Sequence, residues 1–417
     1  FRCLIGDPAA TIERALEAAP AMCMAHVLKG WLYLLGTEPA GIAVACACAA
    51  SAAPLAATER ERRHIEAMAH VAHGRWRAGG LALEDLSVRY PRDALALQAG
   101  HLIDFYRGDA RMLRDRIARA LPAWSEAMPG HHAVLGMYAF GLEENGEFDQ
   151  AEHFGRCAVG LEPRDGWAWH AVAHVHEMRN RPDDGIAWLQ PQSAVWAAES
   201  FFAVHNWWHL ALFHLERDDI DAVLRLFDGP IFGARSPLVL DLIDASALLW
   251  RLHLRGVDVG ERWQAVADNW LPLAEAGTYA FNDAHAMMAF VGAGRAGDGE
   301  RVLAAQRAAV QRDDNAAFIA EVGAAVTRAL QAYGERDYAT TVQLLRAVRS
   351  QAHRFGGSNA QRDLLDLTLI EAALRGGDAP LATALAAERC ARRPRSPLAR
   401  LFAERAAAAP AETALAV

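Results

Sequence analysis

An internal repeat is the feature of this sequence that most constrains its fold. One unit opens with Gly146 and Phe148 and ends at Pro163, at the offsets that tetratricopeptide repeats use. Gly185 then stands where Ala151 stood, one period of about 34 residues later. A period of this length is typical of paired helices that stack on their neighbours. The sequence therefore predicts an all-α protein, an α-solenoid of tetratricopeptide-like helical hairpins that forms a curved superhelix.

Turn signals divide much of the remaining chain into helix pairs. Pro91 and Pro163 each close one pair, because proline cannot continue a helix. Asp93 and Asp165 follow these prolines, and aspartate is a preferred N-cap. Both aspartates are therefore expected to start the next helix.

The domain organisation follows from the spacing of these signals. It becomes irregular between residues 229 and 292, where Gly229-Pro230 and Ser236-Pro237 interrupt the pattern. We interpret this stretch as a longer link or a cap within one superhelix. The prediction is a single tetratricopeptide-like domain over residues 1–417, with an irregular linker at about 229–292 and a frayed tail at about 406–417.

Composition and charge narrow the range of partners. Hydrophobic residues make up 53% and charged residues 22% of the chain, which is a globular composition. The net charge of -9 argues against nucleic acid, because a phosphate backbone requires a basic surface. The uncharged stretch at residues 41–57 consists of small residues that gain too little from lipid to insert, so no membrane partner is expected.

The cysteines and the first residue bear on location. The six cysteines include no Cys-x-x-Cys pair, which predicts reduced thiols and a cytoplasmic protein. The chain begins at Phe1 rather than Met, so the native N-terminus is left open. The sequence is compatible with a homo-oligomer but does not specify one.

Polar residues gather on one face of the helix expected after Asp165. His170, His174 and Glu177 are spaced four and three residues apart, so they project from the same side of a helix. The repeat register turns this side toward the concave surface of the array. His209, in the next hairpin, is expected on the equivalent face. The predicted ligand-binding residues of these two hairpins are His170, His174, Asn206, Trp207 and His209.

Three kinds of chemistry are open to this face. Histidines four residues apart with a carboxylate can bind zinc or iron, and the ligands would then be His170, His174 and His209. The His-Glu-x-x-His motif is absent, so the sequence favours a hydrogen-bonded histidine network without metal. A general acid/base pair of His170 or His174 with Glu177 is the third interpretation. No cofactor is predicted.

A second polar segment lies further along the chain. Asn282 or Asp283 is expected to be the N-cap of a helix, with His285 on its first turn. Asn282 and His285 are candidate ligand-binding residues, and Asp283 and His285 are candidate catalytic residues. Asp241 and Asp244 are further candidates for buried polar groups.

A third polar segment contains a pair of glycines. Gly356-Gly357 leads into a helix N-terminus, whose free backbone N–H groups favour an anion. A Schellman-type helix break is the alternative interpretation. Arg354, Gln361 and Arg362 are the ligand-binding candidates of this segment.

Six segments together resemble the tetratricopeptide repeat protein 38 family, and the likeness covers most of the chain between Tyr90 and Pro397. They are GMYAFGLEENGEFDQAE, WHAVAHVHEM, NWWHLALFHLERDD, LDLIDASALLWRLHLRG, FNDAHAMMAFVGAGR and HRFGGSNAQRDLLDLTLIEAALR. The resemblance implies a helical protein with tetratricopeptide-like repeats, and it implies no particular reaction. In the family a His often follows Gly-Gly-Ser, where this chain has Asn359, so its activity could differ.

The resemblance points to the same residues as the reasoning above. These are His170, His174, Asn206, His209, Asp283, His285 and the segment from Arg354 to Asp363.

Two functions remain open from the sequence. The first is a concave polar pocket that binds a small molecule or a peptide partner. The alternative is an enzyme that uses the His/Glu/Asp cluster, with or without a metal, on an unknown small-molecule substrate. The pocket interpretation predicts that His170, His174, His209, His285 and either Arg354 or Arg362 converge in one cavity.

Overall fold

The computed structural model describes residues 6–309 and 313–408, and this part of the chain is helical almost throughout and contains no β-strand. The all-α prediction is therefore confirmed. The first helices are α1 (Pro8–Ala18), α2 (Cys23–Leu34), α3 (Pro39–Ala52), α4 (Glu59–Ala72), α5 (Trp76–Arg89), α6 (Ala94–Tyr106) and α7 (Ala110–Ala120).

The central helices carry the polar face described above. They are α8 (His131–Glu144), α9 (Phe148–Leu161), α10 (Gly166–Met178), α11 (Pro182–Leu189), α12 (Ser193–Trp196), α13 (Ala203–Glu216), α14 (Ile220–Leu226) and α15 (Val239–Leu254).

The last helices complete the described chain. They are α16 (Arg262–Trp270), α17 (Ala280–Gly292), α18 (Ala296–Ala309), α19 (Asp314–Phe318), α20 (Ala324–Gly334), α21 (Tyr338–Val348), α22 (Asn359–Arg375), α23 (Ala379–Arg392) and α24 (Pro397–Ala408).

Aspartates in the turns start several of these helices. Asp93 and Asp165 each accept a hydrogen bond from a backbone N–H three residues on, which confirms both as N-caps. Each cap is also tied to an earlier helix. His64 Nε2 lies 2.9 Å from Asp93 Oδ2. In the same way, His132 Nδ1 lies 2.7 Å from Asp165 Oδ2, so a histidine contacts the N-cap aspartate at the start of both α6 and α10.

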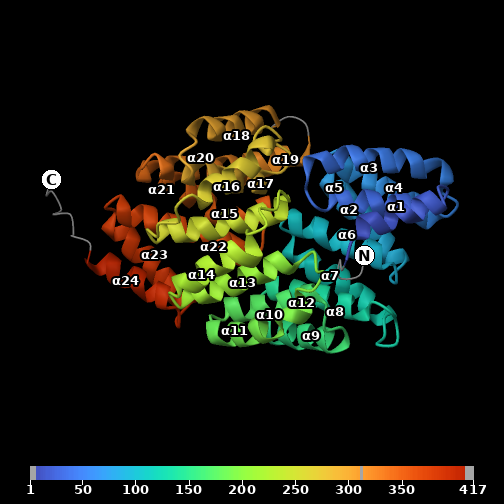
Figure 1. The fold of residues 1–417 in the computed structure, drawn as a ribbon, viewed down its shortest axis with the longest axis horizontal. Coiled ribbons are helices and arrows are strands. Elements are labelled where there is room, and N and C mark those ends of the chain that lie inside the picture. Colours follow the sequence, from blue (N-terminus) through green and yellow to red (C-terminus); the bar gives the residue numbers. More distant parts are fainter. Residues whose placement is uncertain (1–5, 310–312, 409–417) are drawn as a thin grey trace.

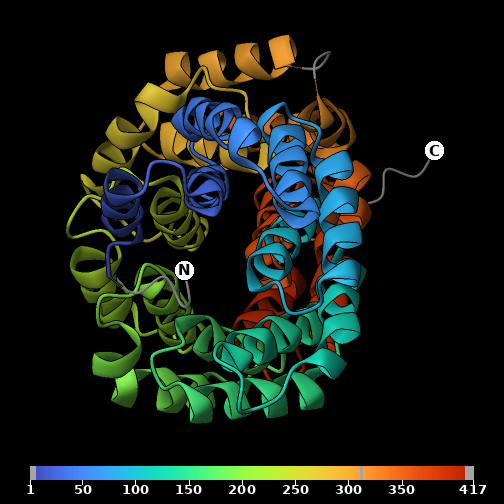
Figure 2. The same ribbon diagram turned by 90° about the vertical axis from the view of Figure 1, so that its right-hand side faces the viewer.

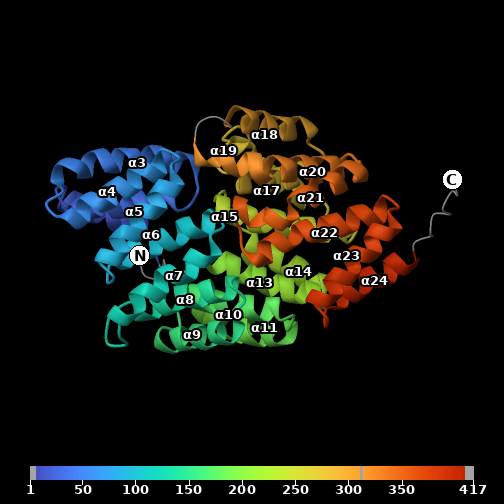
Figure 3. The same ribbon diagram turned by 180° about the vertical axis from the view of Figure 1, so that it is seen from behind.

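Helices that are neighbours in the sequence pack against each other, as α8 does on α9 and α20 on α21. The chain also turns back on itself, so that the helices form a ring in Figure 2, and α19 lies beside α3 and α5 in Figures 1 and 3. Contacts across the ring are direct, since Asn282 Nδ2 donates to Thr37 Oγ1 at 3.1 Å and Val239 N donates to Glu38 Oε1 at 2.7 Å. Helix α22 lies against α15 in Figures 1 and 3 and also contacts α10. A helix from late in the sequence is thus packed against helices from its middle.

Two expectations about irregular segments need correction. The stretch from 229 to 292 is mostly helical, because α15, α16 and α17 lie within it. The interruption is limited to the turn around Gly229, whose φ of -100° and ψ of -106° are not helical, and to the residues up to 238. At the other end, α24 continues to Ala408, so 406–408 are helical and not frayed. The rest of the predicted tail, 409–417, lies outside the described residues.

Two further observations concern the whole described chain. None of its helices combines the length and the apolar character needed to cross a membrane. The cysteines that the structure describes are all free thiols, with Cys23 and Cys48 buried.

Candidate functional site

Helices α10 and α13 pack side by side and bring four histidines together. His170 and His174 lie one turn apart on the same face of α10. His205 and His209 lie one turn apart on the corresponding face of α13. Asn206 holds the two helices in register, because its side-chain amide donates to the carbonyl of Gly166 at 3.0 Å. The helix faces that the sequence predicted to be equivalent therefore meet.

The four imidazoles form one compact group, which we call the four-histidine cluster. Ring centroids of His170 and His174 are 4.3 Å apart, and those of His174 and His209 are 4.6 Å apart. His205 Nε2 lies 3.1 Å from His170 Nε2. One nitrogen from each of the four rings lies within 4.8 Å of the nitrogens from the other three. The sequence missed His205 as a site residue, although it precedes His209 by one turn.

Three carboxylates contact the Nδ1 atoms on the outer side of the cluster. Asp244 of α15 accepts from His205 Nδ1, at 2.8 and 2.9 Å to its two oxygens.

Glu143 of α8 lies 3.1 Å from His174 Nδ1, and Glu177 lies 3.0 Å from His209 Nδ1. The Nε2 atoms of His174 and His209 are buried and have no hydrogen-bond partner among the described residues. Each of these rings thus has its Nδ1 engaged and its Nε2 unoccupied.

Burial sets the protonation of the cluster. It lowers the pKa of His170 and His209 well below the usual value, and the neighbouring histidines lower it further. Burial also lowers the pKa of His174, to about 4. Burial and the charge of Glu177 raise the pKa of Glu143 to about 8. At neutral pH these three imidazoles are therefore uncharged and able to act as ligands or hydrogen-bond partners.

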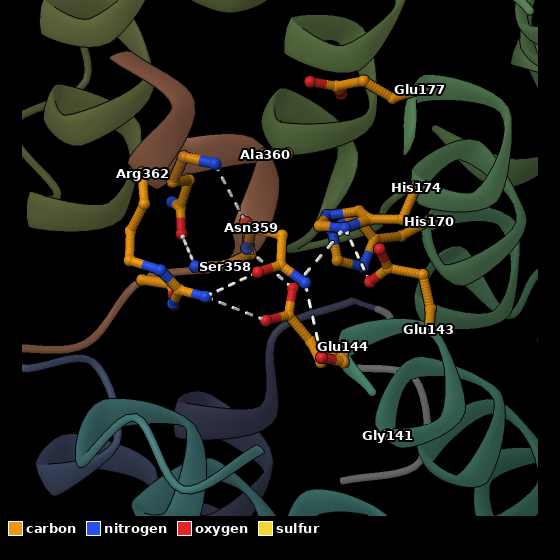
Figure 4. A network of polar contacts seen from close by, with 12 residues as sticks. Gly141, Glu143, Glu144, His170, His174, Glu177, Ser358, Asn359, Ala360 and Arg362 are labelled. Atoms are coloured by element: carbon orange, nitrogen blue, oxygen red, sulfur yellow. Dashed lines mark hydrogen bonds and ion pairs between the residues drawn. The ribbon is translucent and has the colours of Figure 1, made fainter. Parts of the chain in front are cut away.

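The predicted anion site at the start of α22 is occupied by a side chain of the protein. Asn359 N donates to Glu144 Oε1 at 2.8 Å, and Arg362 Nη2 lies 3.4 Å from Glu144 Oε2. Figure 4 shows Glu144 between Arg362 and the pair His170 and His174. The helix N-terminus does attract an anion, as expected, but that anion is the carboxylate of α8.

The rest of this segment is structural. Gly356 has a φ of 92° and Gly357 a φ of 77°. Because residues other than glycine rarely adopt positive φ, the break before α22 depends on these two glycines. Ser358 is the N-cap of α22, and Gln361 completes a capping box with it. Gln361 is thus a capping residue that also borders a small cavity described below.

A larger cavity of about 610 Å³ lies next to the cluster, and we call it the arginine cavity. Its lining residues include Glu177, Arg251, Asp363, Arg389, Arg393 and Phe402. Glu177 belongs to both sites, because it faces the cavity and also contacts His209.

Arg251 is the unusual residue of this cavity. Its side chain is buried, with 5% of the residue exposed, and it donates to the carbonyls of Ala247 at 3.1 Å and Ala360 at 2.9 Å. Its guanidinium lies 5.2 Å from the ring of Trp208, and no carboxylate of the described chain lies within ion-pair distance of it. The sequence analysis missed Arg251, whose only signal is a lone cation in the apolar run SALLWRLHL.

A second, smaller cavity of about 70 Å³ borders the cluster at His170 and His205. Its lining residues include Trp167, His170, Phe202, His205 and Asp244. Trp167 and Phe202 stack on each other with ring centroids 4.0 Å apart. We call this the aromatic cavity, and it gives the cluster a mostly apolar neighbouring space.

Some predicted residues lie away from the cluster. Trp207 packs on Trp196 with ring centroids 4.8 Å apart, whereas Trp208 stacks on His205. Of these two adjacent tryptophans, the sequence analysis named Trp207, whereas Trp208 is the one that contacts the cluster. Arg354 forms a partly exposed ion pair with Glu321.

The second polar segment also differs from its prediction. Helix α17 begins at Ala280, so Asn282 and Asp283 lie inside its first turn and neither is the N-cap. The cap is supplied from a distance, because Asn315 Oδ1 accepts from Ala280 N at 2.9 Å. His285 Nδ1 donates to the carbonyl of Phe281 at 2.8 Å.

The predicted convergence is therefore partial. His170, His174 and His209 meet in one group, and Arg362 reaches it through Glu144. None of the ring contacts between described residues joins His285 to this group. The sequence analysis did not name Glu143 and Arg251, and it named Asp244 only as a buried polar group; all three come from other helices. No protein-family model matches the chain.

Proposed function

We propose that the protein is a tetratricopeptide-like α-solenoid, as its resemblance to the tetratricopeptide repeat protein 38 family implies, and that it binds a small anionic molecule in the arginine cavity. The observation that carries this proposal is Arg251, a buried cation without a carboxylate partner that faces the cavity.

The energetics of Arg251 support an anionic ligand. A buried charge is costly unless an opposite charge or good hydrogen bonds compensate it. Burial lowers the pKa of Arg251 and outweighs the opposite effect of the more distant charges of Asp363 and Glu177. The two backbone carbonyls compensate this cation only in part. An anion bound in the cavity would supply the missing opposite charge.

Seven arginines and five carboxylates line the cavity, so its charged side chains leave an excess of positive charge. Asp363 serves two arginines, since it forms a two-pronged pair with Arg389 at 2.9 and 3.0 Å and lies 3.8 Å from Arg393. Glu371 is likewise shared by two arginines, Arg375 and Arg405. Because each carboxylate neutralises only one of its two partners, positive charge remains available for a ligand.

The size of the cavity favours a small molecule over a peptide. A volume of about 610 Å³ falls in the range of small-molecule sites, about 300–1,000 Å³. Phosphate and carboxylate groups match the planar fork of arginine. We therefore expect a phosphorylated or carboxylated metabolite.

Repetition in the helices supports the solenoid part of the proposal. Helix α9 begins at Phe148 and α11 at Pro182, in keeping with a period of about 34 residues. The recurring bond between a histidine and the next N-cap aspartate points the same way. A cytoplasmic location and a homo-oligomeric state remain predictions from the sequence.

The experiment measures anion binding by calorimetry and by thermal shift, with a panel of phosphorylated and carboxylated metabolites. Arg251→Met keeps the aliphatic stem and removes the charge, and Arg111→Met, at an exposed position, is the matched control. We expect at least one anion to bind the wild type and R111M equally, and R251M at least tenfold more weakly. Equal binding to both variants, or no binding by any anion, would refute the proposal.

A second candidate function is an enzyme, and the position of Glu177 favours it. A molecule in the arginine cavity would lie against a carboxylate that is hydrogen-bonded to His209. Mass spectrometry of metabolites incubated with the protein tests this candidate. Turnover that disappears in Glu177→Gln, while binding persists, would support it, and unchanged turnover in that variant would exclude Glu177 from the reaction.

A further inference from the structure

We propose that the four-histidine cluster binds one divalent transition-metal ion, with Zn²⁺ as the best match, through Nε2 of His174, His205 and His209 and a ring nitrogen of His170. This inference goes beyond the arginine cavity and rests on separate atoms. Imidazole nitrogen is a preferred ligand of zinc, which takes four ligands in a tetrahedron.

Unoccupied nitrogens at the centre of the cluster are the first argument. His174 Nε2 and His209 Nε2 are buried without any partner among the described residues. Leaving a polar atom buried and unpaired costs about 1–3 kcal/mol. These two nitrogens belong to one group of touching rings with the facing Nε2 atoms of His170 and His205, and a metal ion is a partner that four such nitrogens can share.

The carboxylates behind the rings are the second argument. Histidines that bind metals usually donate their other ring N–H to a carboxylate, which fixes the tautomer and turns the ligating nitrogen toward the ion. Glu143 and Glu177 stand behind His174 and His209 in this way, at 3.1 and 3.0 Å from Nδ1. Asp244 stands behind His205 at 2.8 Å. Three of the four rings therefore have the outer contacts of a metal ligand.

The distances between the ring nitrogens are close to those of a tetrahedral zinc site. Zinc–nitrogen bonds of about 2.0–2.1 Å place neighbouring nitrogens of a tetrahedron roughly 3.3 Å apart. The Nε2 atoms of His170 and His205 are already 3.1 Å apart. The cluster nitrogens all lie within 4.8 Å of one another, so rotations of the side chains suffice to close the site.

Charge balance also suits a dication. The four rings contribute neutral donors, whereas Asp244 and Glu177 behind them can offset two positive charges in a buried place. Glu143, Glu144 and His174 form another group that could hold a metal. That group is less suitable, because Glu144 already accepts from Asn359 and pairs with Arg362.

A hydrogen-bonded network without metal accounts for fewer of these atoms. One N–H between His170 and His205 satisfies their facing nitrogens. In either tautomer, however, Nε2 of His174 and Nε2 of His209 remain without a partner in the described chain. The aromatic cavity, which His170 and His205 border, leaves room for water or a small ligand beside a bound ion.

The test uses the full-length protein without an affinity tag, stripped with chelator and then titrated with Zn²⁺ and with Co²⁺. His174→Asn and His209→Asn are the informative variants, because asparagine can keep the hydrogen bond of Nδ1 and lacks Nε2. His73→Asn is the matched control, since His73 is exposed and bonds only the carbonyl of Ala69.

We expect one equivalent of Zn²⁺ to bind the wild type and H73N, and the visible bands of cobalt to report nitrogen ligands in a tetrahedron. H174N and H209N should each bind at least 100-fold more weakly. Glu177→Gln retains all four rings and should weaken binding by about 10- to 100-fold, which provides a second test if an asparagine variant does not fold.

Three results would overturn the inference. These are less than one equivalent of metal in the wild type after loading, binding by H209N and E177Q equal to that of the wild type, or loss of the metal in H73N. Binding of Zn²⁺ by R251M at the wild-type level would show that the metal site and the anion site are independent.

Discussion

The buried ion pair between Asp104 of α6 and Arg116 of α7 should be one of the strongest single determinants of stability in the N-terminal half. Arg116 donates to both oxygens of Asp104, at 2.7 and 3.0 Å, and each side chain is 1% exposed. Its remaining bonds reach the carbonyl of Gly80 at 3.2 Å and Ser87 Oγ at 3.5 Å. The guanidinium thus holds α5, α6 and α7 together.

Replacing Arg116 with Met keeps most of the packing and leaves the carboxylate of Asp104 without its main partner. The next cation, Arg107, lies 4.0 Å away. Removing one partner of a buried pair costs about 3–5 kcal/mol, because an uncompensated charge stays in the interior. Burial raises the pKa of Asp104 even beside Arg116, so without Arg116 the carboxyl takes up a proton more readily. The loss should therefore be smaller at pH 5 than at pH 8.

Urea unfolding, followed by far-UV circular dichroism and by tryptophan fluorescence, measures the loss. Arg119→Met is the control, because Arg119 pairs with Glu84 near the surface and should contribute less than about 1 kcal/mol. The double variant D104L/R116M should recover most of the stability, since both charges are removed. A loss below about 1 kcal/mol in R116M, or equal losses in R116M and R119M, would refute the reasoning.

Two further predictions concern stability. Burial raises the pKa of Asp283 to about 7 from the usual 3.8, so the free energy of unfolding should fall as pH rises between these values, by at most about 1.4 kcal/mol per pH unit. Asp283→Asn should therefore stabilise the protein at pH 8 and change its stability little at pH 4. Urea unfolding at the two pH values measures this, and an equal change in the free energy of unfolding at both would contradict the prediction. A Cβ on Gly356 would lie 1.8 Å from Tyr279 Oη, so Gly356→Ala should lower the melting temperature far more than Gly377→Ala. Gly377 has a similar φ of 78° and open space around it, so its substitution reports the backbone term alone, about 1–2 kcal/mol. Similar melting temperatures for the two alanine variants would argue against the clash.

Patterns in the sequence predicted the helices and three of the four histidines of the cluster. The spacing of His170 and His174 and the caps Asp93 and Asp165 depend only on residues within one or two turns, and the structure agrees with them. His209 was predictable because the repeat relates α13 to α10.

Contacts between distant segments could not be predicted in this way. Asn315 caps α17 from 35 residues away, and this contact takes the place of the local cap that Asn282 or Asp283 was predicted to provide. Glu144 fills the start of α22 from 215 residues away, which no local pattern around Asn359 announces. The choice between adjacent tryptophans depended on a rotation of about 100° per residue along a helix, and a register defined by Gly185 alone was too coarse for that.

The bond from Asn359 N–H to Glu144, described above as the filling of an anion site, also has a consequence for folding kinetics. An array in which each repeat touches only its neighbours can nucleate anywhere and can lose an end without collapse of the rest. Here, the start of α22 is completed only when α8 has arrived from 215 residues away. Contacts of such sequence separation slow folding, since the connecting chain must be ordered before they form. The molecule should therefore fold slowly, with α8 and α22 in one cooperative unit.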